Sequence, residues 1–322
     1  MSRLAWLIAA LALAGCDGAP APAPTWRTAL ADDGGPLLAA WGDRADDLWL
    51  VGGGPGDDGA RVVRWTGVAT PVAIGRSERL WWVWGARDGT RWLVGAAGLV
   101  LRGDDAGFAV VPSATAATLY GVWGSGPDDV WIVGGIANGA ADPDDDLVLH
   151  WDGAALTRRA VPARGAALFK VWGSAADDVW LSGEQGTLWH WDGAGFAAHH
   201  QPTAASILTV AGCDRDEAYA VGGSHVWQWD GATWTEATGL PSLAFVAGVA
   251  CGPDDVLVVG AQGLRLRRPQ GGGAWIDERD AAAPIDLHGA WAGGDGGLMA
   301  VGGDYLIAPG AVRRGVAAVR GP

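Results

Sequence analysis

The chain of 322 residues contains 53 glycines, 21 tryptophans and a single lysine, Lys170, and its formal net charge is −14. This acidic balance argues against nucleic-acid binding, because a polyanion would be repelled and the sequence has no basic stripe that could release counterions. The length suits either two domains or one large ring, and the internal repeats decide between them.

Residues 1–15 have the pattern of a bacterial lipoprotein signal peptide. Arg3 is basic, and Leu4 to Ala14 form an apolar run that is too short to span a bilayer as a helix. The run ends in Leu13-Ala14-Gly15-Cys16, which resembles the lipobox of bacterial lipoproteins. We therefore expect cleavage before Cys16 and lipidation of that cysteine.

Residues 16–24 alternate Ala and Pro after Asp17, a composition that favours an extended, semi-rigid tether. Together with the lipidated cysteine, this tether predicts a protein anchored in the bacterial cell envelope, on the non-cytoplasmic side of a membrane. The sequence leaves open whether that membrane is the inner or the outer one.

Residues 25–322 repeat one unit seven times. The unit reads LYGVWGSGPDDVWIVGG in Leu119 to Gly135 and LFKVWGSAADDVWLSG in Leu168 to Gly183. Each copy has an anchor residue that is followed by a glycine eleven positions later. A fixed internal spacing with insertions between copies indicates one supersecondary unit per repeat. The anchors are Trp41, Trp84, Trp123, Trp172, Ala211, Val249 and Trp291.

Each unit is predicted to form four short strands. In the third copy the first strand ends in V-W-G, the second follows an Asp-rich turn and spans 129–134, and the third spans 147–151. The W-D-G-A sequences at 151, 191 and 229 predict hairpin turns into a fourth strand. The second strand is apolar on both faces, with Trp131 on one and Ile132 on the other, as expected for a sheet between two neighbouring sheets. These features predict an all-β fold, a seven-bladed β-propeller with four antiparallel strands per blade.

The V-W-G-S-x-x-D-D-V-W and W-D-G-x-x-W elements resemble the repeats of bacterial WD/BNR-like propeller lipoproteins over roughly residues 26 to 318. The W-D-G-A-T-W turn at 229–234 also distantly resembles the Asp-box of sialidase-type propellers, although Gln228 to Asp230 lacks the serine of that box. The resemblance implies the fold and lends no support to sialidase chemistry.

Closure of the ring has two alternatives. Thr25 to Leu30 resembles a fourth strand such as Thr233 to Ala237, so the N-terminus can complete the last blade. Ala311 to Val319 could instead supply that strand.

Most residues that could take part in catalysis or ligand binding are better explained by a structural role in the repeat. The tryptophans recur at equivalent strand positions, which favours packing between blades. His150 and His190 precede W-D-G turns, where other copies place Arg64, Arg102 and Gln228, so this position is a polar part of the scaffold. His199 and His200 are consecutive in a strand and point to opposite faces. The repeated Asp-Asp pairs are expected to cap turns.

One acidic run lies outside the repeat, in the loop between the second and third strands of the third copy. Asp142, Asp144 and Asp146 present hard oxygen ligands at alternate positions and are candidates for a calcium site. The glycine and the distal bidentate acid of a calcium loop are missing, so a solvated acidic loop is the favoured interpretation. No other cofactor is expected.

No catalytic motif is present, which favours a non-catalytic binding or assembly module. The turns after V-W-G-S and W-D are nearly uniform, whereas the loops on the opposite side vary, and variable loops on a rigid scaffold usually carry recognition. Candidate contact residues on that variable-loop face are Asp57, Asp58, Arg61 and Asp145. The expected partner is an envelope protein or polysaccharide, and the expected state is a monomer. The alternatives are a carbohydrate-active propeller and a purely structural envelope protein.

Cys213 and Cys251 each follow an anchor by two residues, in the fifth and sixth copies. Equivalent points on neighbouring inner strands converge toward the axis of a propeller, so a disulfide between them is feasible. Export supplies an oxidising compartment. The alternative is two free, small cysteines in the place of Ser125 and Ser174.

Overall fold

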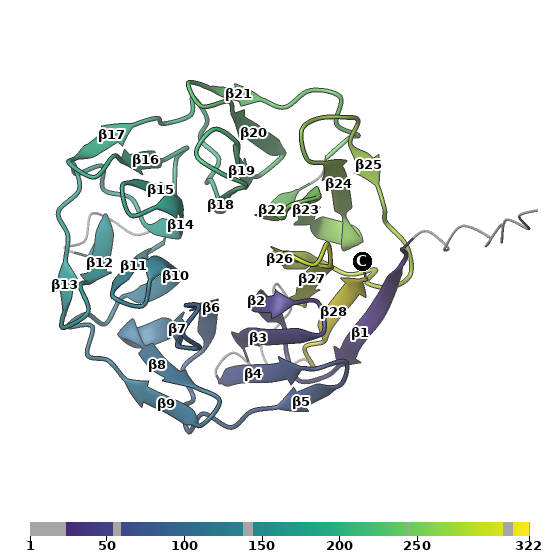
Figure 1. The fold of residues 1–322 in the computed structure, drawn as a ribbon, viewed down its shortest axis with the longest axis horizontal. Coiled ribbons are helices and arrows are strands. Elements are labelled where there is room, and N and C mark those ends of the chain that lie inside the picture. Colours follow the sequence, from purple (N-terminus) through teal and green to yellow (C-terminus); the bar gives the residue numbers. More distant parts are fainter. Residues whose placement is uncertain (1–23, 54–58, 138–143, 244, 305–311, 322) are drawn as a thin grey trace, which may run out of the picture.

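The structure is a computed structural model that describes residues 24–53, 59–137, 144–243, 245–304 and 312–321. These residues form seven antiparallel sheets of four strands, arranged as the blades of a closed ring (Figure 1). The predicted seven-bladed β-propeller is therefore confirmed. Residues 1–23, which carry the predicted signal peptide and Cys16, lie outside the described part of the chain, as do Asp57, Asp58 and Asp142.

In each blade the strand nearest the axis is followed by a second, a third and an outer strand (Figure 1). The inner strands are β2 (Leu37–Arg44), β6 (Leu80–Gly85), β10 (Thr118–Gly126), β14 (Leu168–Ala175), β18 (Thr209–Gly212), β22 (Val246–Cys251) and β26 (Leu287–Ala292). The second strands are β3 (Asp47–Gly53), β7 (Arg91–Gly95), β11 (Asp129–Gly135), β15 (Asp178–Gly183), β19 (Ala218–Gly222), β23 (Asp255–Gly260) and β27 (Leu298–Gly303).

The third and outer strands complete the blades. The third strands are β4 (Ala60–Trp65), β8 (Val100–Asp104), β12 (Leu147–Trp151), β16 (Leu188–Trp191), β20 (His225–Trp229), β24 (Arg265–Pro269) and β28 (Gly315–Arg320). The outer strands are β5 (Ala69–Pro71), β9 (Gly107–Val110), β13 (Leu156–Arg158), β17 (Phe196–Ala198), β21 (Trp234–Glu236), β25 (Ile276–Asp277) and β1 (Trp26–Asp32). Two short 3₁₀ turns, η1 (Ala96–Gly98) and η2 (Ala261–Gly263), precede third strands. Within the described ranges no helix is long and apolar enough to cross a membrane.

The last blade is closed by both ends of the chain. Strand β1 pairs antiparallel with β28, from Trp26 opposite Arg320 to Asp32 opposite Gly315, and β28 pairs with β27. The N-terminus therefore supplies the outer strand and the C-terminus supplies the third strand. The alternative in which the N-terminal segment forms the outer strand is therefore correct. The C-terminal segment forms the strand next to it, closer to the axis.

The W-D-G turns are held by their aspartates. Asp152 Oδ1 accepts hydrogen bonds from the backbone N–H groups of Ala154 and Ala155, at 3.0 and 2.8 Å. These backbone hydrogen bonds lower the pKa of Asp152. Gly153 adopts a φ of 91°, a conformation that strains any residue with a Cβ. The same contacts recur at Asp192 and Asp230.

The second strands fill the space between blades, as their two apolar faces predict. Trp131 is 1% exposed and packs with Leu168 and Val179 of the following blade. Ile132 is fully buried on the other face and packs with Trp92 of the preceding blade. Each blade is therefore buried on both faces, and the hydrophobic core is distributed around the ring rather than gathered at one centre.

The inner strands are joined by a contact between a tryptophan and a glycine. A methyl group on Gly85 would lie 2.6 Å from the ring of Trp41 in the preceding blade, so the indole occupies the space that a side chain at Gly85 would need. Trp84, Trp123 and Trp172 cover the glycines of the next blades in the same way, and Trp291 donates a hydrogen bond from Nε1 to the carbonyl of Gly42, at 2.9 Å. The covered glycines are Gly124, Gly173 and Gly212.

We expect Gly85→Ala to destabilise the protein by about 1–3 kcal/mol, because the added methyl group overpacks the indole of Trp41. Gly126→Ala is the matched control, since a Cβ at Gly126 meets nothing within 4 Å. Urea unfolding measures both free energies. The Trp41→Ala change should remove most of the cost of the alanine at position 85 in the double variant. Equal stability of the two single variants would contradict this account.

Candidate functional site

A cavity of about 720 Å³ lies on the axis, at the end of the ring that carries the uniform turns. This volume is within the usual range of ligand pockets. Inner-strand residues of all seven blades line the cavity, together with the first turns of several blades. The five tryptophans that cover the inner-strand contacts are part of the lining: Trp41, Trp84, Trp123, Trp172 and Trp291.

Lys170 is the buried cation of this cavity. It lies on β14, lines the cavity and is 3% exposed. Its Nζ donates a hydrogen bond to the backbone carbonyl of Tyr120, at 2.8 Å, and lies 4.1 Å from the ring centroid of Trp82. Burial lowers the pKa of the Lys170 ammonium to about 7. Lys170 is not among the site residues predicted from the sequence, although it is the one lysine of the chain and could have been identified by that signal.

An aromatic collar lies on the axis on the far side of Lys170 from the uniform turns. We define it as Trp81, Tyr120, Phe169 and His288, which stand one position before the level of Lys170 on their inner strands. Ring centroids are 5.0 Å apart for Trp81 and Tyr120, 5.3 Å for Tyr120 and Phe169, and 6.3 Å for Trp81 and His288. None of the four lines the cavity, so the cavity ends at the level of Lys170. Burial and the charge of Lys170 lower the pKa of His288 to about 4.

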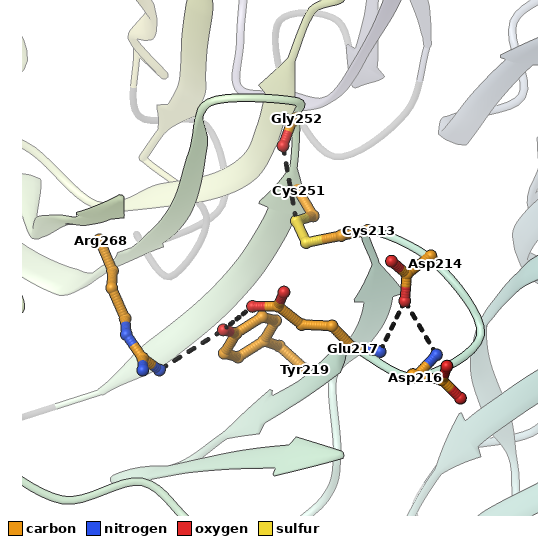
Figure 2. Close-up of a disulfide and its surroundings, with 8 residues drawn as sticks. All are labelled: Cys213, Asp214, Asp216, Glu217, Tyr219, Cys251, Gly252 and Arg268. Carbon is orange, nitrogen blue, oxygen red and sulfur yellow. Dashed lines mark hydrogen bonds between the residues drawn. A yellow bond between two sulfur atoms is a disulfide. The ribbon is translucent and has the colours of Figure 1, made fainter. Parts of the chain in front are cut away.

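The two cysteines are joined beside the cavity mouth (Figure 2). The Cα atoms of Cys213 and Cys251 are 5.0 Å apart, within the range of about 4.4 to 6.8 Å that a disulfide requires. Cys251 lines the cavity. Beneath the disulfide, Tyr219 donates a hydrogen bond from its hydroxyl to Glu217, at 2.6 Å (Figure 2).

The cysteines do not share one pairing position, contrary to the expectation from their spacing. Cys251 is paired opposite Val256, as Gly124 is paired opposite Val130. Cys213 instead follows the last paired residue of β18. The reason is that β10 has a bulge with an extra residue between Gly124 and Gly126, and β22 has no such bulge. A comparison of the two cysteines by residue count from their anchors is therefore wrong by one position.

The structure describes two of the candidate residues of the variable-loop face, Arg61 and Asp145. Arg61 is 9% exposed and pairs with Asp32 through Nη2, at 2.7 Å from each carboxylate oxygen. The backbone carbonyl of Asp145 accepts a hydrogen bond from Arg158, at 3.3 Å. Arg61 is therefore too deeply placed to contact a partner directly.

The described aspartates of the acidic run, Asp144 and Asp146, accept hydrogen bonds from other parts of the protein. Asp144 accepts hydrogen bonds from Thr115 Oγ1, at 2.6 Å, and from Arg158, at 3.0 Å. Asp146 is 9% exposed, and its Oδ2 accepts the backbone N–H groups of Arg164 and Gly165. Among the described residues no group of three His, Cys, Asp or Glu side chains could hold a metal ion. Asp142 lies outside the described residues, so the calcium interpretation stays a prediction.

The histidines before the W-D-G turns have the scaffold role predicted for them. His150 Nε2 lies 2.6 Å from Asp129 Oδ1, and its ring packs 4.5 Å from the centroid of Trp131. The hydrogen bond from His150 helps to lower the pKa of Asp129 against the opposing effect of burial. Corresponding pairs occur in other blades: His190 with Asp178, Arg64 with Asp47, and Arg267 with Asp255.

His199 and His200 follow the end of β17 at Ala198, so they do not lie in the outer strand as predicted, but their rings do pack against different tryptophans. The ring of His199 packs against Trp180, with centroids 5.0 Å apart. Nδ1 of His200 accepts the backbone N–H of Leu188, at 3.1 Å, and its ring packs against Trp189. Burial lowers the pKa of both histidines.

No family model and no curated protein matches the chain. Solved structures do resemble it. YCF48 from Cyanidioschyzon merolae has a TM-score of 0.66 at 13% identity, covering 92% of this chain and 99% of that one. The WD40 β-propeller domain of Doa1 has a TM-score of 0.67 at 10% identity, covering 91% and 96%. A structure described as YCF48 bound to D1 peptide has a TM-score of 0.64 at 14% identity, covering 92% and 94%. At these identities the likeness shows the fold alone.

We expect the double variant Cys213→Ser, Cys251→Ser to lose about 2–4 kcal/mol of unfolding free energy, because the disulfide limits the freedom of the unfolded chain. Denaturant unfolding with and without reductant measures this loss. Reductant should destabilise the native protein and leave the double variant unchanged. Mass spectrometry of the non-reduced protein should find the two cysteine peptides joined, and separate peptides would refute the bridge.

Lys170 is expected to lose its proton near pH 7 instead of near the ordinary value of 10.5. Between these values the unfolded chain holds a proton that the native protein lacks, so the free energy of unfolding rises with pH across this window. Lys170→Met should therefore raise the melting temperature most at and below pH 7, and the gain should shrink toward pH 10.5. The titration midpoint of Lys170 is measured by NMR of labelled lysine. A midpoint above pH 10 would show that burial does not lower the pKa of the ammonium.

Proposed function

We propose that this protein is a non-catalytic binding or assembly module that receives a segment of a partner protein in its axial cavity. The observation that carries the proposal is the 720 Å³ cavity itself, lined by tryptophans and holding a buried lysine. Concave sites with apolar walls and few polar groups are typical of ligand binding. The structural neighbour described as bound to a D1 peptide is a propeller of the same architecture, which supports a protein ligand.

The proposal includes display from a membrane of the bacterial cell envelope through lipidated Cys16. The sequence of residues 1–24 supports this part, including its resemblance to WD/BNR-like propeller lipoproteins. The outer position of β1 is compatible with it, because a tether that precedes Trp26 would join the ring at its rim and leave the axial cavity uncovered. The module is proposed to be monomeric.

A carbohydrate-active propeller is the second candidate. Glycoside hydrolysis ordinarily takes a pair of carboxylates, and the described residues that line the cavity include one, Asp43. The tryptophan walls could stack on sugars, and for this reason the alternative is worth a direct test. Turnover of a polysaccharide that is lost in Asp43→Asn would favour it over the binding module.

The location of binding can be tested with two matched serine variants. Ser174 is exposed and lines the cavity, whereas Ser224 is exposed between β19 and β20, on the variable-loop face. A partner captured from the native envelope is purified, and its Kd is measured for Ser174→Trp and Ser224→Trp. We expect Ser174→Trp to weaken binding at least tenfold and Ser224→Trp to leave it unchanged. Because Ser174→Trp also removes the hydrogen bond from Ser174 Oγ to Asp178, the melting temperature of each variant is measured beside its affinity.

The opposite result would relocate the binding surface. Loss of affinity in Ser224→Trp alone would favour the variable-loop face, as the sequence predicts, and would overturn the cavity as the binding site.

A further inference from the structure

Lys170 is a departure from the repeat and not a part of it. The residue two positions before the inner-strand anchor is uncharged in the second, third and fifth blades: Trp82, Gly121 and Thr209. Among the described residues Lys170 contacts a backbone carbonyl and an indole ring, and no acidic side chain is paired with it. Removal of an ammonium ion from water costs several kcal/mol when no partner charge is present. Packing alone therefore gives no account of a lysine at this position.

The surroundings of Lys170 determine from which side a partner charge can arrive. On one side the aromatic collar crosses the axis, where Trp81 of the second blade reaches His288 of the last. On the other side lies the open cavity with its tryptophan walls. An anion can therefore reach the ammonium only along the cavity, from the end with the uniform turns.

We propose that Lys170 binds a carboxylate at the end of a polypeptide segment that enters the cavity. One ammonium ion matches the single charge of a carboxylate, whereas a phosphate dianion would leave excess charge in a site of low dielectric. The collar stops a chain from passing through the ring, so a segment that fills the cavity has its end near Lys170. The tryptophans of the walls offer contacts to the side chains that precede that end. This inference rests on the proposed function and names the ligand class of the same site.

The pH dependence of binding follows from the groups around the ammonium. His288 is neutral above pH 5, because its pKa is about 4, and burial raises the pKa of the Tyr120 hydroxyl, which stays neutral as well. Lys170 is thus the group of this set that changes charge between pH 6 and pH 9. A bound carboxylate stabilises the ammonium form and raises the pKa of Lys170.

The experiment uses the folded chain with isotope-labelled lysine, which gives one side-chain signal since the sequence contains one lysine. The probe is a pool of N-acetylated tetrapeptides with free C-terminal carboxylates, and the matched probe is the same pool as C-terminal amides. We expect the free-acid pool to shift the Lys170 signal, to raise its titration midpoint by at least one pH unit, and to bind at least tenfold more tightly at pH 6 than at pH 9. The amidated pool should bind at least tenfold more weakly.

Two variants separate the buried ammonium from general charge effects. Lys170→Met should abolish the preference for the free-acid pool. Arg279→Met removes an exposed cation of the rim that pairs with Asp277, and it should leave that preference unchanged.

Three outcomes would overturn the inference: equal affinity of the two peptide pools, an unchanged preference in Lys170→Met, or a Lys170 signal that responds to glucuronate or inorganic phosphate and to neither peptide pool. Failure here is distinguishable from failure of the proposed function. A natural partner that is lost in Ser174→Trp and retained in Lys170→Met would leave the binding module intact and refute the carboxylate site alone.

Discussion

The ring depends on the packing of one blade's tryptophan against the next blade's glycine at the inner strands. Blades converge toward the axis, so their inner strands leave little room for side chains between them. A glycine in one strand makes space for a whole indole from its neighbour, as Gly85 does for Trp41. The tryptophan and the glycine of one V-W-G sequence thus take part in two different contacts. The tryptophan serves the following blade, and the glycine serves the preceding one.

Blades five to seven show that this contact acts as a matched pair. Ala211 and Ala250 stand in the tryptophan position by pairing register, opposite Tyr219 and Leu257. Wherever the tryptophan is absent, the following blade has no need of glycine, and it carries Cys251 or Ala292 there. Cys251 packs in one hydrophobic cluster with Ala211 and Cys213, and the disulfide joins the two blades at this junction, which lacks both the tryptophan and the glycine. A covalent link thus replaces a packing contact at one junction of the ring.

The sequence predicted the architecture because the architecture is periodic. An anchor position and a glycine occur at the same spacing in all seven copies, so the blades can be identified even where one copy departs from the pattern. The second strands are apolar on both faces, which indicates that both faces are buried. The feasibility of the disulfide followed from the same periodicity. Its details did not, because the missing bulge in β22 changes the pairing register without changing the count of residues.

The candidate site was harder to predict, since single residues determine it and the repeat does not. Lys170 has no equivalent in the other copies, and only the three-dimensional arrangement shows that it lies in a cavity next to a collar drawn from four blades. Arg61 illustrates the converse. Its position in a variable loop suggested exposure, yet it is buried against Asp32, the last residue of β1, which lies just before the chain enters the blade of Arg61.

The pairing of β1 with β28 also sets the order in which the chain can complete its fold. The first described strand has no partner until the last one has been synthesised, so the earlier blades can assemble while the ring is still open. Contacts between the two ends of a chain are the slowest to form, because the whole intervening chain must first be brought together. A chain that is cut short before Gly315 would lose a third strand and leave β1 unpaired. Such a product would expose the edge of β27 and the apolar face of the first blade, both of which attract proteases and other open chains. Closure by β1 and β28 thus makes the last step of folding a check that the final blade is complete.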